Sequence, residues 1–150
     1  MRPRQAMWFA RYMTYQDPEV IRRLLTDTNR WAIVGLSSNR ERAAHTISAF
    51  LKRVLGKEIV PVHPKAEVVH GETGYATLAE VPGDIDVVDI FLRPDLADAV
   101  VDEAIARGAK AVWLPLDVVC EEAAQRAEAA GLEVVMNACP AIEAPKLGLA

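Results

Sequence analysis

The sequence predicts a single α/β domain of three layers, in which helices cover both faces of a doubly wound, mainly parallel sheet. Short apolar runs that suit strands buried on both faces alternate with amphipathic segments of roughly 10–14 residues, as right-handed βαβ units do. The chain has 150 residues, of which 51% are hydrophobic. This is enough for one domain with a buried core, and it argues against disorder.

The N-terminal part predicts an arm and a helix over residues 1–27, packed on a domain that spans residues 28–150. Asp17 and Pro18 suit a helix start, because the Asp side chain can cap free backbone N–H groups and proline is tolerated at the first helical position. One apolar face then follows at helical spacing. It consists of Val20, Ile21, Leu24 and Leu25.

Five apolar runs predict the strands, and the amphipathic stretches between them predict the remaining helices. The strands are expected at residues 31–35, 58–62, 85–91, 111–116 and 132–136. The helices are expected at residues 43–55, 77–81, 96–107 and 119–130. This order of elements is Rossmann-like, with an extra N-terminal helix.

Charge and composition narrow the classes of function. The net charge of −4 argues against nucleic acid as the main partner, because a phosphate backbone calls for a basic face. No apolar run reaches the roughly 18 residues of a membrane span. Cys120 and Cys139 make no disulfide framework, and the N-terminus lacks the apolar core of a signal peptide, so a reducing cytoplasm is expected.

The first candidate loop runs from Gly35 to His45 and opens a helix. Ligands of such sheets bind outside the carboxyl ends of the strands, where strand order reverses. Backbone N–H groups at the start of this helix can hold phosphate, Ser37 and Ser38 add hydrogen-bonding side chains, and Arg42 can pair with a phosphate. One glycine does not make the G-x-G-x-x-G fingerprint, and an ordinary strand-to-helix turn is the alternative.

The second candidate loop discriminates between nucleotides. An NAD-binding domain places Asp or Glu near the end of its second strand to hold the ribose hydroxyls. Here that strand ends in His63, Pro64 and Lys65, so a cation stands where the acid should be. This favours a phosphorylated ribose, which both coenzyme A and NADP carry. A solvent-facing lysine in a turn is the alternative.

Other polar residues give weaker signals. Phe91 and Arg93 follow the third strand. Phe91 can pack on adenine, with packing in the core as the alternative. Arg93 can bind a phosphate, with simple exposure on the surface as the alternative. The three histidines have no metal-ligand spacing, so no metal site is expected. No nucleophile–base pair stands out. Asp86 and Asp89 lie in or beside a strand, where Asp is unusual, and can hold a neighbouring loop.

An ordered set of short motifs runs through nearly the whole chain, over about residues 28–147. It comprises Trp31-Ala32-Ile33-Val34-Gly35-Leu36-Ser37, Arg42, Val60-Pro61-Val62-His63-Pro64-Lys65, Gly71, Tyr75, Leu78, Val87-Val88-Asp89-Ile90-Phe91, Val112-Trp113-Leu114, Cys139 and Glu143. The set resembles the CoA-binding domain family, small relatives of the N-terminal domain of the succinyl-CoA synthetase alpha subunit. No single motif is specific, but the ordered set is.

The resemblance implies a stand-alone, non-catalytic module that binds CoA or acyl-CoA. It places the phosphates over the first loop and the phosphorylated ribose near Lys65, with the third loop and Trp113 close to the nucleotide. The expected coenzyme contacts are Gly35, Ser37, Ser38, Arg42, His63, Pro64, Lys65, Phe91, Arg93 and Trp113. A homo-oligomer or an unidentified protein partner stays open, and so do two alternatives: an NADP-binding oxidoreductase-like protein and an interaction module that has lost its ligand.

The chain departs from the family pattern mainly at the thiol end of the expected coenzyme. His63 stands where the family usually has Asn. The family often has Trp-x-Gln-x-Gly, whereas this chain has Pro115 and Asp117 after Trp113. The family's Arg before the late Cys and its His after the late Glu are replaced here by alanines. These alanines are Ala138 and Ala144.

Overall fold

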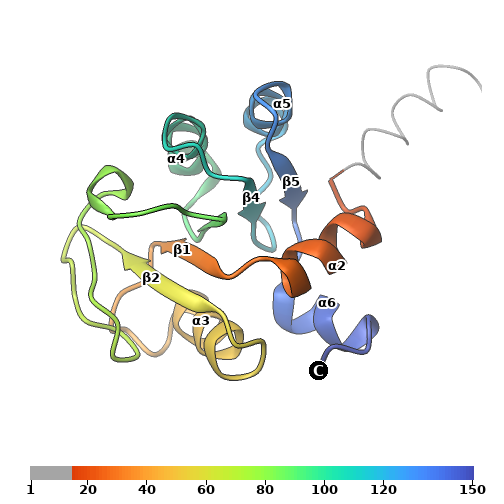
Figure 1. The fold of residues 1–150 in the computed structure, drawn as a ribbon. Helices are drawn as coiled ribbons and strands as arrows, with labels where there is room; N and C mark the ends of the chain where they lie inside the picture. The colour runs from red at the N-terminus through yellow and green to blue at the C-terminus, as the bar shows by residue number, and fades with distance from the viewer. Residues whose placement is uncertain (1–14) are drawn as a thin grey trace, which may run out of the picture.

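The computed structural model describes residues 15–150, which form a five-stranded parallel sheet with helices on both faces (Figure 1). The expected arm at residues 1–14 lies outside the described residues. The strands are β1 (Arg30–Val34), β2 (Glu58–Val62), β3 (Val87–Ile90), β4 (Ala111–Leu114) and β5 (Glu133–Met136). The helices are α2 (Pro18–Asp27), α3 (Ala43–Arg53), the 3-10 helix η1 (Leu78–Glu80), α4 (Pro94–Ala106), α5 (Glu121–Ala129) and α6 (Pro140–Lys146).

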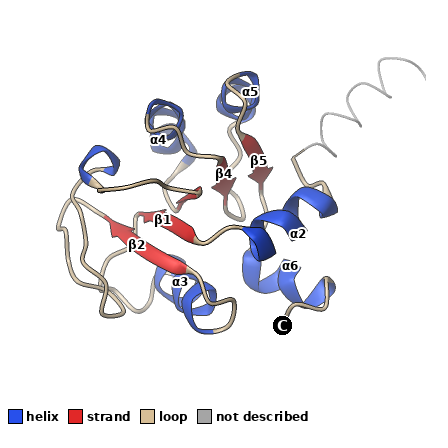
Figure 2. Ribbon diagram, viewed as in Figure 1, coloured by secondary structure: helices blue, strands red, loops and turns tan. Residues whose placement is uncertain are grey.

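The strand order is β2-β1-β3-β4-β5, and every neighbouring pair is parallel. Helices α4 and α5 lie on one side of the sheet and α2, α3 and α6 on the other, which gives three layers (Figure 2). The predicted α/β, Rossmann-like fold is therefore confirmed. The strands agree with the predicted runs to within one or two residues at each end, because continuous apolar runs are what strands buried on both faces require.

Alternate residues of each strand feed two separate cores. On the face of α4, α5 and η1, Val88, Ile90, Val112 and Leu114 pack with the small buried side chains of α4 and α5. On the other face, Trp31 and Trp113 pack against α2, α3 and α6. The centroids of the two tryptophan rings lie 5.6 Å apart. Both tryptophans are fully buried, so they anchor the sheet to this helical layer.

The N-terminal helix α2 begins as its sequence predicts. The Asp17 side chain accepts a hydrogen bond from the backbone N–H of Glu19 at 2.9 Å, and Pro18 occupies the first turn. The buried face of α2 comprises Ile21, Leu24 and Leu25. Helix α6 follows the last strand and is not among the predicted elements; it runs for seven residues on the same side of the sheet as α2 and α3.

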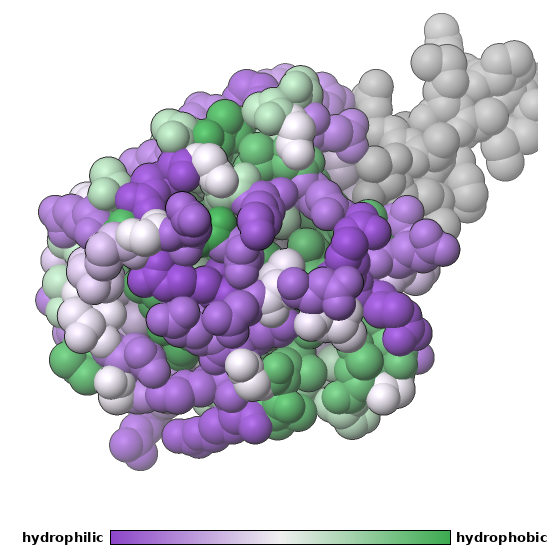
Figure 3. All heavy atoms as spheres, in the orientation of Figure 1, coloured by the Kyte–Doolittle hydropathy of each residue, from purple (hydrophilic) through white to green (hydrophobic). Residues whose placement is uncertain are grey.

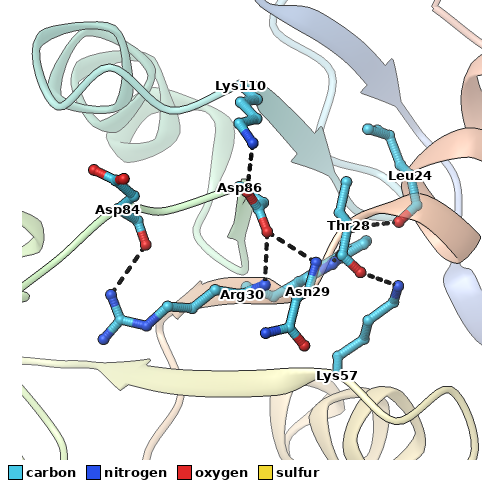
Figure 4. A network of polar contacts seen from close by, with 9 residues as sticks. Leu24, Thr28, Asn29, Arg30, Lys57, Asp84, Asp86 and Lys110 are labelled. Carbon is cyan, nitrogen blue, oxygen red and sulfur yellow. Dashed lines mark hydrogen bonds and ion pairs between the residues drawn. The ribbon is translucent and has the colours of Figure 1, made fainter.

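A polar network holds the amino ends of the central strands (Figure 4). The carboxylate of Asp86 accepts hydrogen bonds from the backbone N–H groups of Asn29 (2.8 Å) and Arg30 (2.9 Å) and forms an ion pair with Lys110 (3.1 Å). Burial opposes ionisation of Asp86, but these donors lower its pKa overall. Asp86 thus ties together the starts of β1 and β4, as a loop-holding role predicts.

Hydrophilic residues cover most of the middle of the face in Figure 3, whereas hydrophobic residues gather at its lower right, over α6. Among residues 15–150, the exposed large apolar side chains are scattered along the chain. They are Val54, Val68, Leu96, Leu116, Val119 and Ile142. Within the same residues, no helix is both long and apolar enough to cross a membrane.

Candidate functional site

The carboxyl ends of β1, β2 and β3 lie side by side at one edge of the sheet, which we call the switch edge. Val34 pairs in register with Val62 of β2 and with Ile90 of β3, so the loops that follow these strands start next to one another. The chain leaves β1 through α3 on one face and leaves β3 through α4 on the other. Strand order therefore reverses between β1 and β3, where doubly wound sheets bind ligands.

Gly35 is required at the centre of the switch edge. Its φ of +96° is one that side chains rarely adopt, and a Cβ on Gly35 would lie 2.3 Å from the carbonyl oxygen of Phe91. The backbone N–H of Gly35 donates to the carbonyl of Val62 (2.8 Å), and that of Phe91 donates to the carbonyl of Val34 (2.8 Å). Gly35 thus lets the three strand ends converge, and any larger residue would separate them.

The first loop, residues 35–42, folds on its own polar side chains. Ser37 Oγ accepts from the backbone N–H of Asn39 (3.2 Å), and Asn39 Oδ1 accepts from that of Glu41 (3.0 Å). Arg42 is exposed and immediately precedes α3, whose first turn receives no side-chain cap. Arg42 thus occupies the N-cap position of α3 and makes no ion pair within residues 15–150.

The second loop presents its lysine to solvent. His63 and Ala66 close a tight turn through a backbone hydrogen bond of 2.7 Å, and the backbone N–H of Lys65 donates to His63 Nδ1 at 3.1 Å. Pro64 and Lys65 are exposed, whereas His63 is half-buried. On the far side of the loop, Tyr75 exchanges backbone hydrogen bonds with the end of β2. The loop is fixed at both ends, and the Lys65 side chain is available at its tip.

A contact between Ser38 and Glu67 joins the first loop to the second. Ser38 Oγ donates to one Glu67 carboxylate oxygen at 2.7 Å, and the Ser38 backbone N–H approaches the other at 3.5 Å. The hydrogen bond from the Ser38 hydroxyl is the main cause that lowers the pKa of Glu67, with help from the charges of Lys65 and His63. Sequence reasoning missed Glu67, because its partner lies 29 residues away and no motif marks the pair.

The third loop contributes Phe91 and Arg93 to the switch edge. Phe91 is half-buried and packs against the core on the α3 side. Arg93 is exposed and lies 3.4 Å from the carboxylate of Asp95. Trp113 differs from both: it has no exposed surface, and its indole N–H donates to the carbonyl of Ala138 at 2.9 Å. Trp113 therefore supports the loop after β5 from below and presents no surface to a ligand.

The loops at the expected thiol end hold each other. The backbone N–H of Asp117 donates to the side chain of Asn137 at 2.8 Å, which links the loop after β4 to the loop after β5. Ala138 and Ala144, at positions where the family has Arg and His, are buried. Cys139 is also buried, with 9% of its surface exposed. These loops are closed by small and backbone groups.

Asp89 is a buried carboxyl group with no hydrogen-bond partner in the part of the chain that the structure describes. It lies in β3, beside Ile33 of β1 and Trp113 of β4, and it is fully enclosed on the α3 side of the sheet. Neither of its oxygens has a hydrogen bond among residues 15–150, and burial raises its pKa well above the usual range. The expectation that Asp89 holds a loop is therefore wrong, whereas it is correct for Asp86.

An acidic groove of about 560 Å³ lies between the first turns of α4 and α5. Its lining comprises Pro94, Asp95, Asp98, Ala99, Asp102, Val119, Cys120, Glu121 and Glu122. Arg126 neutralises part of this charge through ion pairs to Asp98 and Asp102. Burial raises the pKa of the Cys120 thiol, so this cysteine is a poor nucleophile. The lining carboxylates make the groove unsuitable for phosphate.

A serine–histidine contact occurs away from the switch edge. Ser48 Oγ lies 3.0 Å from His70 Nε2, and the His70 ring contacts the His45 ring in a tilted arrangement, with centroids 4.3 Å apart. Ser48 is fully buried and also bonds to the His45 carbonyl, so no substrate can reach it. The contact fastens the second loop to α3. Among residues 15–150, no three side chains of metal-ligand type come together.

Comparison with known proteins identifies relatives of similar size. The sequence is 33% identical over 119 residues to the uncharacterized protein YneT of Bacillus subtilis, which covers 79% of this chain and 87% of that protein. The structure matches that of a hypothetical protein from Pyrococcus horikoshii with a TM-score of 0.81 and 38% identity, covering 87% of this chain and 91% of the other.

A more distant similarity extends to part of a larger enzyme subunit. Over 81 residues the chain is 26% identical to the alpha subunit of an ADP-forming acetate–CoA ligase of Pyrococcus furiosus, which covers 54% of this chain but only 18% of that subunit. The sequence model of one family, described as the CoA binding domain, matches residues 29–145. The match spans all five strands and includes the switch edge. The chain therefore belongs to the CoA-binding domain family.

Proposed function

We propose that this chain binds coenzyme A or an acyl-CoA at the switch edge, as a stand-alone module without catalysis of its own. Family membership supports the ligand class. The observation that carries the placement is the convergence of three loops with exposed cations, Arg42, Lys65 and Arg93, at the ends of β1, β2 and β3. Cations grouped at a strand-order reversal suit a ligand with several phosphates.

Each loop has a separate role in the proposed complex. The first loop takes the diphosphate, through its backbone N–H groups, its serines and Arg42. The second loop takes the phosphorylated ribose through Lys65, and the third borders the nucleotide with Phe91 and Arg93. The proposed contact residues are Gly35, Ser37, Ser38, Arg42, His63, Pro64, Lys65, Phe91 and Arg93, and Trp113 supports them from within the core.

The donors at the switch edge fit a phosphorylated coenzyme. The Ser38 hydroxyl and backbone N–H already face a carboxylate, so this part of the first loop complements an anion. At the second loop, Lys65 stands where an acidic residue would hold unphosphorylated ribose hydroxyls. The first feature suits the diphosphate, and the second favours a ligand whose ribose carries phosphate, as CoA does at its 3′ position.

Calorimetric titration with CoA, dephospho-CoA and NADP tests the proposal. CoA should bind more tightly than dephospho-CoA by about ten- to a hundredfold, because a charge-assisted hydrogen bond contributes about 1.5–3 kcal/mol. Lys65→Ala should remove most of that difference. Tighter binding of NADP than of CoA would favour the oxidoreductase-like alternative, and no binding of any nucleotide would favour an interaction module.

The absence of catalysis rests on the chemistry of the described nucleophiles. Ser48 is fully buried, Cys139 is nearly so, and burial raises the pKa of the Cys120 thiol. The ligase subunit that shares this domain is several times longer, so its name assigns no reaction to this chain. Incubation with acetyl-CoA and longer acyl-CoAs should release no thiol. Release that disappears in a Cys139→Ala variant would refute the proposal and identify that cysteine as the nucleophile.

A further inference from the structure

The Glu67 carboxylate occupies the donors that the first loop would offer to a ligand. Ser38 contributes two donors, a hydroxyl and a backbone N–H, and both are directed at Glu67, at 2.7 and 3.5 Å. A carboxylate resembles a phosphate in this setting, because both present two or more anionic oxygens to N–H and O–H donors. In the free protein, the first loop therefore already holds an anion that belongs to the chain itself.

The same carboxylate belongs to the second loop, two residues after Lys65. After the Ser38 hydrogen bonds, the charge of Lys65 makes a smaller contribution to the lowered pKa of Glu67. By the same attraction, Glu67 offsets part of the positive charge that Lys65 would present to a phosphate. One acidic side chain thus weakens two of the proposed phosphate contacts at once.

The backbone beneath Glu67 is fixed, so the side chain can leave without refolding the loop. A Cβ on Gly74 would lie 2.1 Å from the carbonyl oxygen of Glu67, which shows how closely the two backbone segments pack. Val69 and Glu72 exchange backbone hydrogen bonds of 3.1 and 2.9 Å just beyond them. Glu67 itself is only half-buried, so rotation of its side chain moves the carboxylate into solvent.

We propose that Glu67 is an internal competitor for the phosphate of the ligand, which must displace this carboxylate from Ser38 to bind. The inference rests on the proposed function and adds an affinity-setting residue to it. Displacement frees the Ser38 donors for the diphosphate that the first loop is proposed to take. Ligands that lack a diphosphate cannot compete at Ser38 and leave Glu67 in place.

Glu67→Gln tests the proposal, with Glu72→Gln as its matched control. Each variant removes one negative charge from the same loop, but Glu72 pairs with Lys52 at 3.0 Å and makes no contact with Ser38. Calorimetry should show that Glu67→Gln binds CoA about three- to tenfold more tightly than the parent, the range expected for loss of one partly exposed charge-assisted contact. Glu72→Gln should stay within about twofold of the parent.

A second pair of variants asks whether Ser38 carries the effect. In a Ser38→Ala background, Glu67→Gln should change CoA affinity by less than about twofold, because the hydroxyl contact of 2.7 Å is gone and only the long backbone N–H contact of 3.5 Å remains to be displaced. A Glu67→Gln protein that binds CoA equally well or more weakly than the parent would overturn the inference while leaving the proposed function intact. Weaker binding would make Glu67 an acceptor for the ligand. Failure of the parent and all variants to bind CoA would overturn both.

Discussion

Replacement of Asp89 by Asn exchanges the buried carboxyl group for an amide of nearly the same size that cannot ionise. The parent carries a fully enclosed carboxyl group in β3 with no hydrogen bond to either oxygen among residues 15–150. A buried polar group left in this way costs about 1–3 kcal/mol. Asp89→Asn leaves most of that cost in place, so any effect of pH on the difference between the two proteins reports ionisation alone.

The sign of the pH effect follows from the raised pKa of Asp89. Its pKa in the folded protein is well above 3.8, its ordinary value, because burial disfavours the charged form. Between those two values the unfolded chain has lost the proton and the folded protein retains it. The stability of the parent therefore falls, relative to Asp89→Asn, by about 1.4 kcal/mol per pH unit in that window, and the difference levels off above the folded pKa.

Urea unfolding from about pH 2 to about pH 8, followed by tryptophan fluorescence, measures the effect and covers the windows of both carboxyl groups. Trp31 and Trp113 are fully buried beside β3 and report its packing. Asp86→Asn is the control with opposite sign, because the pKa of Asp86 is lowered. The stabilisation that ionised Asp86 contributes is present above its pKa in the unfolded chain, and it is lost as the pH falls through its pKa in the folded protein. A stability difference between parent and Asp89→Asn that stays constant with pH would refute the reasoning.

Two further substitutions test the switch edge. Gly35→Ala should lower the free energy of unfolding by about 2 kcal/mol or more, because Gly35 has a positive φ and a Cβ there would meet the carbonyl of Phe91. Urea unfolding measures this change, and an unchanged midpoint would contradict the geometry. Arg42→Ala should weaken CoA binding by about 1.5–3 kcal/mol with little change in Tm, and the effect should shrink with added salt. An Arg42→Ala protein that binds CoA as tightly as the parent would refute the proposed placement of the phosphates at the first loop.

The sequence predicts most of the fold because buried strands and amphipathic helices leave periodic patterns. Residues 58–62 are a strand with the predicted limits, and the others differ by one or two residues at an end. Helix α6 escapes prediction for a physical reason. It spans only seven residues, includes Pro145, and is too short to repeat an apolar face over several turns. Helix α6 is stabilised by tertiary packing, for example of its buried Ala144 in the core. No local sequence pattern predicts such packing.

The candidate site is predicted less completely, because spacing along the chain identifies loops but not side-chain direction. The order of strands and helices correctly places Gly35, Lys65 and Arg93 on neighbouring loops. An aromatic at the end of an apolar run can face either a crevice or the core, and the structure encloses Trp113 in the core. The contact of Ser38 with Glu67 depends on the path of the second loop, which the sequence does not determine.

Charge is distributed unevenly along the carboxyl edge of the sheet, and this orients the proposed ligand. Arg42, Lys65 and Arg93 follow β1, β2 and β3, whereas carboxylates line the groove between α4 and α5 beyond β4. Phosphates are attracted to the first region and repelled from the second. The uncharged arm of a CoA molecule must then extend toward the loops after β4 and β5. Small groups and backbone hydrogen bonds close those loops, so affinity in the proposed complex comes mainly from the nucleotide end.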